Sequence, residues 1–222
     1  MRTLYHQPLD PFCRKIRLIL GEKALEATLI PENPAERRHD FLAINPAGEI
    51  PVLLEDGTIA ICGHGAITEY LDEMRPEPML IGRHPRERAE ARRLAAWFDE
   101  KFYREVTRNI LDEKLVKRLS KTGQPDSSAI RAGLANIRTH LDYITYLMDR
   151  RSWLAGERFS IADIAAAAHL SCVDYCGDVP WENYSAVKDW YVRIKSRPSF
   201  RSILADSLPG APPPRHYADL DF

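Results

Sequence analysis

The sequence predicts an α/β domain followed by an all-α domain. Short apolar runs separated by turn signals fill the first third of the chain, whereas the pattern from Pro85 onward is helical and shows no strand signal. Between them, the segment RPEP at residues 75–78 interrupts both patterns. We therefore expect the α/β domain at residues 1–78, a docking linker at 79–85, the helical domain at 86–208, and a Pro-rich spacer with a C-terminal interaction tail at 209–222.

Turn and cap signals place the elements of the α/β domain. Asp10-Pro11 marks the start of the first helix, because aspartate caps a helix N-terminus and proline fits its first turn. Asp56-Gly57 lies between two apolar runs and predicts a hairpin. The expected order is strand 3–5, a helix that runs to Gly21, strand 27–30, helix 41–44, strands 52–54 and 59–61, and helix 65–74, which is a βαβαββα unit.

Helical periodicity continues through the second domain. Ser160 and Asp163 match a capping box, in which the side chain of each residue satisfies a backbone N–H group at the helix start. The helix that follows is apolar on nearly all sides, so we expect it in the centre of the domain. Helices are expected at about 86–119, 128–149, 164–175 and 186–196.

Composition excludes several classes of protein. The chain has 222 residues, of which 45% are hydrophobic and 28% charged, and its net charge of -1 is that of an ordinary globular protein without polyelectrolyte character. The four cysteines show neither a disulfide framework nor a CxxC pair, which favours a reducing compartment. The N-terminal residues lack the apolar run of a signal peptide, and no segment approaches the roughly 20 apolar residues of a membrane span. We expect a cytoplasmic protein with no transmembrane segment and no nucleic-acid partner.

Several motifs occur in a specific order and spacing: DPFCRK at 10–15, NPAG at 45–48, IPV at 50–52, residues 156–163, and RPSF at 197–200. Together they resemble the glutathione transferase superfamily over nearly the whole chain. The resemblance implies a glutathione transferase fold, in which the N-terminal domain is thioredoxin-like, with a glutathione site beside Ile50-Pro51. It also implies a cis peptide bond there, which agrees with the need to turn the preceding backbone toward a peptide ligand.

The residues that could activate a thiol depart from this family pattern. In the Ser and Cys branches the activating residue lies at the entrance of the first helix, and the matching position here is Asp10. An ionised carboxylate repels a thiolate and cannot donate a hydrogen bond. Tyr5 is either a hydroxyl donor or a residue of strand packing. Cys13 is either a nucleophile whose pKa the helix dipole lowers or a buried, inert thiol.

A second departure concerns the residues that open the helix after the hairpin. Glutathione transferases usually carry an acidic residue and a serine there to hold the γ-glutamyl end, whereas this chain has Gly63 and His64. Loss of one charge-assisted hydrogen bond costs roughly 1.5–3 kcal/mol of binding free energy. We expect a degenerate glutathione pocket without catalytic residues or a cofactor, formed by Tyr5, Asp10, Cys13, Ile50, Pro51, Gly63 and His64.

Cys172 and Cys176 are one helical turn apart and have no further ligands beside them, so we interpret them as packing residues and expect no metal site.

The C-terminal end is a candidate interaction segment. PGAPPP at 209–214 is a stiff, extended spacer, and aromatic, acidic and aliphatic residues alternate in the RHYADLDF that follows. A tail that folds back on its own domain is the alternative interpretation. The expected partner contacts are Tyr217, Asp219, Leu220, Asp221 and Phe222.

Basic residues outnumber acidic ones between residues 83 and 121. A solvated helix face is one explanation of this excess, and a surface for an acidic protein partner is the other.

Within the superfamily, the Gly63-His64 departure and the ADLDF ending resemble a non-enzymatic branch of bacterial division factors. This resemblance implies a homodimer, recruited to the division site, that binds filaments of the tubulin-like protein FtsZ and alters their curvature and bundling. It also implies that the tail contacts the septal cell-wall synthesis machinery. A glutathione-dependent transferase and a stress-regulating or chaperone-like binding protein are the alternatives. The expected filament contacts are Arg37, Arg38, Phe41, Arg104, Arg108, Lys114, Lys117 and Arg118.

Overall fold

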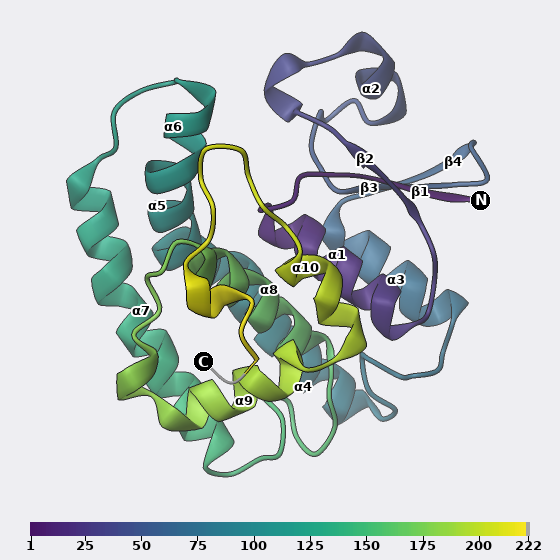
Figure 1. Ribbon diagram of the computed structural model, residues 1–222. Coiled ribbons are helices and arrows are strands. Elements are labelled where there is room, and N and C mark those ends of the chain that lie inside the picture. The colour runs from purple at the N-terminus through teal and green to yellow at the C-terminus, as the bar shows by residue number, and fades with distance from the viewer. Residues whose placement is uncertain (221–222) are drawn as a thin grey trace. The chain divides into compact units, whose positions relative to one another are not determined.

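The computed structural model describes residues 1–220, which divide into two compact units (Figure 1). Unit 1 consists of Met1–Leu80 and Pro198–Asp206, and unit 2 consists of Ile81–Arg197 and the chain from Ser207 onward. The predicted fold class, an α/β domain followed by an all-α domain, is confirmed. The segment Pro198–Asp206, expected as part of the helical domain, clusters with unit 1 because it packs on the first helix.

Unit 1 is built on one sheet with the strand order β2-β1-β3-β4. Strand β1 pairs in parallel with β2 and antiparallel with β3, and β3 and β4 form the predicted hairpin. Figure 1 shows α1 and α3 on the same face of this sheet. The elements are β1 (Arg2–His6), α1 (Pro11–Glu22), β2 (Thr28–Pro31), η1 (Pro34–Glu36), α2 (His39–Ile44), β3 (Val52–Glu55), β4 (Ile59–Cys62), α3 (His64–Met74), η5 (Pro198–Phe200) and α10 (Arg201–Leu204).

The returning segment of unit 1 explains why α1 carries buried arginines. Asp206 accepts hydrogen bonds from both Arg17 amino groups, at 2.8 and 3.0 Å, and from Arg14 at 3.1 Å. Both guanidinium groups are therefore paired in a bidentate or charge-assisted manner, as buried charges require. Gly21 allows the approach itself, since a Cβ atom there would lie 2.8 Å from Cβ of Ser199.

A buried lysine, Lys23, is the C-cap of α1. Lys23 is 1% exposed, and its ammonium group donates to Asp72 of α3 at 2.5 Å and to the carbonyl groups of Arg75 and Pro78 at 2.7 and 2.8 Å. Asp72 also accepts from the backbone N–H of Leu80 at 3.0 Å. Because these partners lie in the last turn of α3 and in the segment directly after it, the Lys23–Asp72 pair fixes the path of the chain at the end of α3.

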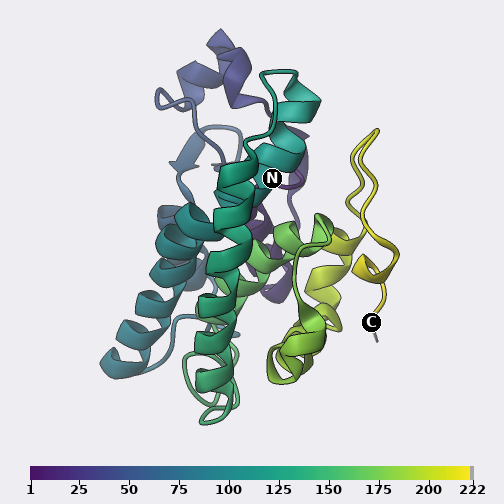
Figure 2. The same cartoon turned by 90° about the vertical axis from the view of Figure 1, so that its left-hand side faces the viewer.

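The secondary structure elements of unit 2 are helices. The predicted helix at 86–119 is a continuous helical run from Pro85 to Ser120 in which two stretches have π-helical hydrogen bonding, and α7 lies beside this run (Figure 2). The elements are α4 (Pro85–Ala96), the π-helix η2 (Trp97–Thr107), α5 (Arg108–Leu111), the π-helix η3 (Asp112–Val116), α6 (Lys117–Ser120), α7 (Ser127–Met148), α8 (Ile161–Tyr175), η4 (Trp181–Asn183), α9 (Ser185–Lys195) and η6 (Arg215–Tyr217).

Helix α8 is the core of unit 2, as its composition predicted, and all fifteen of its residues are buried. The predicted capping box is present at its start. Asp163 accepts from the backbone N–H groups of Leu154 and Ser160, from the Ser160 hydroxyl and from the indole of Trp190 at 2.9–3.1 Å. Burial raises the pKa of Asp163, although these four hydrogen bonds favour its charged form. One carboxyl group thus joins the loop before α8, the helix start and α9.

Among the described residues, none of the helices combines the length and the apolar character that crossing a membrane requires.

Replacement of Asp163 by alanine should lower the free energy of unfolding by about 3 kcal/mol or more, because each buried donor left without an acceptor costs about 1–3 kcal/mol. Asp126 is a matched control: it caps α7 by accepting from the N–H groups of Ser128 and Ala129, but it is exposed. The Asp126→Ala change should cost only about 1 kcal/mol. Urea denaturation of both variants measures the difference, and equal losses would contradict the role given to burial.

Candidate functional site

The start of α1 carries the first group of predicted pocket residues. Asp10 is the N-cap: its side chain accepts from the backbone N–H of Cys13 at 2.7 Å, and Pro11 follows in the first turn as predicted. The Asp10 carboxylate therefore caps the start of α1, close to the Cys13 thiol. Its negative charge disfavours a thiolate beside it because like charges repel.

Cys13 is a buried thiol and not an activated one. Its side chain is 0% exposed, and its pKa lies well above the ordinary value because of burial, with a further contribution from the charge of Asp10. Thiolate character and access are both needed for a nucleophilic cysteine. Of the two interpretations of Cys13, the structure supports the inert thiol.

Tyr5 lies in the centre of the sheet on β1, paired with Ile30 and Val52. Its ring packs against Phe41 at a centroid distance of 5.5 Å. Tyr5 is half-buried, as is usual for a strand residue whose side chain packs on a neighbouring element. The structure therefore supports the packing interpretation of this tyrosine.

The predicted cis peptide bond between Ile50 and Pro51 is confirmed. Pro51 is buried, and its carbonyl oxygen accepts a hydrogen bond from the backbone N–H of Gly63 at 3.2 Å. This bond places the residues that open α3 directly beside the cis proline. The framework on which the family binds glutathione is thus retained in this chain.

The two residues at the start of α3 make contacts with the protein itself. Gly63 is the N-cap with φ of +85°, a conformation that glycine adopts without the steric cost of a side chain, and it provides no side-chain cap. The His64 ring stacks on Phe12 of α1 with a centroid distance of 4.5 Å and an interplanar angle of 22°. An aromatic pair therefore occupies the helix start where a carboxylate and a hydroxyl would hold a charged ligand.

Phe12 is the residue of this pocket that the sequence analysis missed. It belongs to the DPFCRK motif, but nothing in the local pattern indicates that its ring meets His64, which is 52 positions away in the chain. The contact depends on how α1 and α3 pack on the same face of the sheet.

Two predicted interaction residues are buried, and these expectations were wrong. Phe41 is 1% exposed because its ring packs on Tyr5, so it is not available to a filament. Tyr217 is 0% exposed because its ring packs edge-on against Tyr175, at a centroid distance of 5.2 Å. The tail thus folds back on its own unit at this point, which was the alternative interpretation.

The remaining predicted tail residues differ in position. Asp219 is exposed, and Leu220 is 41% exposed. Asp221 and Phe222 lie outside the described residues.

The predicted basic residues differ in exposure. Arg37, Arg38, Arg104, Arg108 and Arg118 are exposed, whereas Lys114 and Lys117 are half-buried. Arg38 pairs with Asp40 at 2.8 Å, Lys114 with Asp178 at 2.6 Å and Lys117 with Glu113 at 2.6 Å, and Arg118 donates to the carbonyl of Gly210 at 3.0 Å. By exposure, the arginines are better candidates than the two lysines for contact with an acidic surface.

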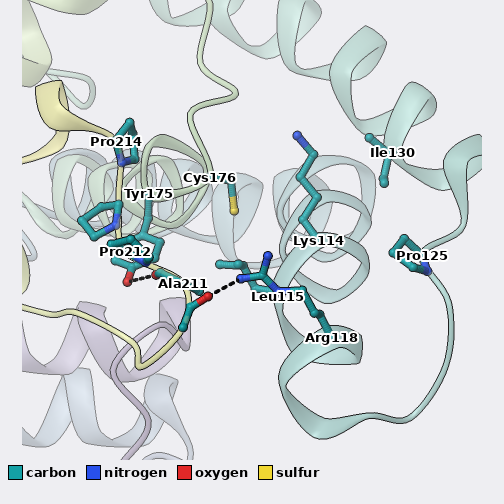
Figure 3. Close-up of a pocket in the computed structure, with 12 residues that line it drawn as sticks. Lys114, Leu115, Arg118, Pro125, Ile130, Tyr175, Cys176, Ala211, Pro212 and Pro214 are labelled. Atoms are coloured by element: carbon teal, nitrogen blue, oxygen red, sulfur yellow. Dashed lines mark hydrogen bonds between the residues drawn. The ribbon is translucent and has the colours of Figure 1, made fainter.

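Unit 2 also has a groove of about 660 Å³ between the long helical run and the proline segment (Figure 3). Lys114 and Arg118 project into it from one side, and Tyr175 and Cys176 at the end of α8 line it together with the prolines at 212–214. Both cations are already paired within unit 2, so the groove combines apolar walls with no converging reactive groups. Among the described residues no cluster of three or more His, Cys, Asp or Glu side chains is arranged to hold a metal ion.

Both halves of the chain match known family models. The model described as the N-terminal domain of glutathione S-transferase matches residues 4–79, and the model of the C-terminal domain matches residues 127–193. FtsZ-localized protein A of Caulobacter vibrioides is 52% identical over 224 residues, which cover 100% of this chain and 98% of that protein.

Two solved structures are similar over the same length. One, described as a glutathione S-transferase from Rhodospirillum rubrum F11, is 54% identical, covers 100% of both chains and has a TM-score of 0.98. The other, FzlA from C. crescentus, is 51% identical, covers 100% of this chain and 99% of that one, and has a TM-score of 0.95. The likeness therefore extends over both units and the C-terminal segment.

Iodoacetamide treatment of the folded protein at pH 8 should alkylate Cys13 at least about tenfold more slowly than the half-buried Cys62, since a pKa one unit higher alone reduces the thiolate tenfold. Mass spectrometry of the quenched protein gives both rates. The Asp10→Asn variant keeps an N-cap oxygen and removes the charge. It should raise the rate at Cys13 only slightly, because burial is the larger cause of the shift. Comparable alkylation of the two cysteines in the wild-type protein would contradict the buried thiol.

Proposed function

We propose that this chain, which belongs to the glutathione S-transferase family, is a non-enzymatic, dimeric scaffold that binds FtsZ filaments at the bacterial division site. The observation that carries the proposal is the 52% identity, over the whole chain, to a protein named FtsZ-localized protein A. A cytoplasmic location follows from the same proposal.

The contacts of the pocket residues support the proposed absence of catalysis. Asp10 caps α1, Cys13 is buried, and His64 stacks on Phe12. Each of these side chains stabilises the protein itself, and none presents a hydroxyl or a thiolate to a ligand held at Pro51. Activation of a thiol requires a donor placed to stabilise the developing charge.

Exposed arginines support the filament contact. Arg104 and Arg108 are one turn apart on the long helical run, and Arg37 and Arg38 form a second pair in unit 1. Arg108 lies 3.8 Å from Asp112, but 65% of its side chain is exposed to solvent. Its positive charge therefore remains accessible to an acidic partner. Local basic patches of this kind guide an acidic protein surface without a large net charge.

A surface formed by α4, α7 and Arg150 directly after α7 supports self-association. Tyr146 is 53% exposed and stacks with Tyr143, while Arg150 lies over the Tyr146 ring at 3.9 Å. Arg93 donates to the Tyr143 hydroxyl at 3.0 Å. Exposed aromatic and arginine side chains are enriched in the centres of protein interfaces.

A dimer gives the proposed scaffold two equivalent filament sites. Two linked sites can bridge neighbouring filaments and make the second contact intramolecular. This bivalency is our explanation for the proposed effects on filament curvature and bundling. We propose further that the C-terminal tail links the filaments to septal cell-wall synthesis through its exposed end at Asp219 and Leu220.

A glutathione-dependent transferase is the second candidate. The observation in its favour is the 54% identity to a structure described as a glutathione S-transferase from Rhodospirillum rubrum F11. The retained cis Ile50–Pro51 bond is compatible with it. The two candidates differ in whether glutathione binds.

Titration calorimetry with glutathione should give no binding tighter than about 1 mM, because the charge-assisted contacts to the γ-glutamyl end have been lost. A Gly63→Glu/His64→Ser variant restores an acidic residue and a serine at these positions. It should bind glutathione about tenfold more tightly than the wild-type protein, with some loss of stability at the positive φ of residue 63. Micromolar binding by the wild-type protein would favour the transferase.

Co-sedimentation with polymerised FtsZ tests the scaffold directly. The wild-type protein should pellet with filaments at moderate salt, and an Arg104→Glu/Arg108→Glu variant should bind about tenfold more weakly or worse. Arg131→Glu/Arg138→Glu, which reverses two exposed arginines on α7, is the control matched for the change of charge and should pellet like the wild-type protein. If the wild-type protein stays in the supernatant, the scaffold function is wrong. If the Arg104→Glu/Arg108→Glu variant and the control bind equally, the helical patch is wrong.

A further inference from the structure

The C-terminal strap, residues 208–219, is tied to unit 2 by polar contacts along its length. The Tyr175 hydroxyl at the end of α8 accepts from the backbone N–H of Leu208 at 2.8 Å and donates to the carbonyl of Ala211 at 2.7 Å (Figure 3). Arg118 donates to the carbonyl of Gly210 from the other side of the groove. Figure 2 shows the strap as an extended yellow loop that returns to a short helical turn before the C-terminus. The spacer is therefore held at its first turn.

Two further contacts hold the strap where that helical turn lies. Asp174 of α8 is completely buried, and its Oδ1 atom is 3.0 Å from Nε2 of His216 and accepts from the Trp181 indole at 2.8 Å. Lys195 at the end of α9 is 1% exposed and donates to the backbone carbonyls of Asp219 at 2.6 Å and of His216 at 3.3 Å. The polar groups that meet the strap thus come from two different helices.

These contacts involve charges that are costly to bury. Burial lowers the pKa of Lys195 to about 8, against the opposing charges of Asp174 and Asp219, and burial likewise raises the pKa of Asp174. The Tyr217 ring, next in the chain to His216, is fully buried against Tyr175. Apolar side chains could hold a strap at lower cost, whereas ions and directed hydrogen bonds hold it in one geometry.

We propose that Asp174, Lys195, His216 and Tyr217 form a latch that fixes the strap on unit 2, so that the exposed Leu220 is presented at one defined point. They are positioning residues for the tail contact, and the idea rests on the tail's role in the proposed function. The strap is ordered before any partner arrives. The conformational entropy of the strap is therefore lost when the protein folds and not when a partner binds. Preorganisation of this kind strengthens binding.

The latch also divides the tail by role. Tyr217 and the backbone of Asp219 belong to the anchor, and Leu220 with its 41% exposure begins the part that is presented. The prolines at 212–214 therefore lie in a loop that is attached to unit 2 at both ends, where they stiffen its path. They do not act as a free, extended linker.

Trypsin cleavage of the full-length protein after Arg215 measures the latch. This exposed arginine opens the turn at 215–217, and a protease needs the surrounding backbone to detach before it can cut there. Lys195→Met removes the ammonium group at nearly constant size and should accelerate this cleavage about tenfold or more. Lys117→Met removes a lysine that pairs with Glu113 on the long helical run, and it should leave the rate unchanged.

A second variant keeps the test decisive if Lys195→Met fails to fold. His216 is 37% exposed, so His216→Ala breaks the contact with Asp174 at an accessible position, and it should raise the rate after Arg215 about threefold or more. Circular dichroism melting identifies which variants are folded. Folded Lys195→Met or His216→Ala protein cleaved at the wild-type rate would overturn the latch.

Filament binding separates the latch from the proposed function. Folded Lys195→Met protein should still co-sediment with FtsZ filaments like the wild-type protein, because the latch residues are not among the proposed filament contacts. If the wild-type protein fails to co-sediment while cleavage still depends on Lys195, the filament function is wrong and the latch is correct. If Lys195→Met loses filament binding while its melting is unchanged, the separation of tail and filament contacts is wrong.

Discussion

The structure of unit 2 depends on partners for the polar side chains at the two ends of a completely buried helix. Helix α8 has no face in solvent, so the polar side chains at its ends must hydrogen-bond within the protein. Asp163 does this at the start by accepting from the preceding loop, the helix and α9. At the other end, Asp174 and Tyr175 meet the C-terminal strap. The same constraint therefore organises the core and determines where the tail is attached.

The altered pocket and the attached tail lead to the same view of the molecule. At Pro51 the backbone framework of the family remains, while the side chains around it contact one another in place of a ligand. At the C-terminus, buried charged groups hold a segment that a simple linker would leave free. The buried Cys13 and the stacked His64 thus contribute to the stability of the protein.

Local signals in the sequence were reliable, whereas the expected exposure of Phe41 and Tyr217 was wrong. The Asp10 cap, the hairpin at Asp56-Gly57 and the capping box at Ser160 and Asp163 each depend on residues within a few positions of one another, and all are present. In contrast, Tyr217 was expected to meet a partner because aromatic and acidic residues alternate around it. That alternation says nothing of Tyr175, whose ring covers it from 42 positions earlier in the chain.

The sequence by itself determined the order of the main elements and the two-domain class, because helix caps, turns and apolar periodicity depend on neighbouring residues. The cis Ile50–Pro51 bond was implied by the resemblance to glutathione transferases. Only the tertiary structure decided that Phe12 covers the start of α3, that Asp206 returns to α1 and that Lys195 holds the strap. These contacts join residues that are distant in the chain. These contacts form only because the packed helices bring the residues together, and a local sequence pattern does not indicate how the helices pack.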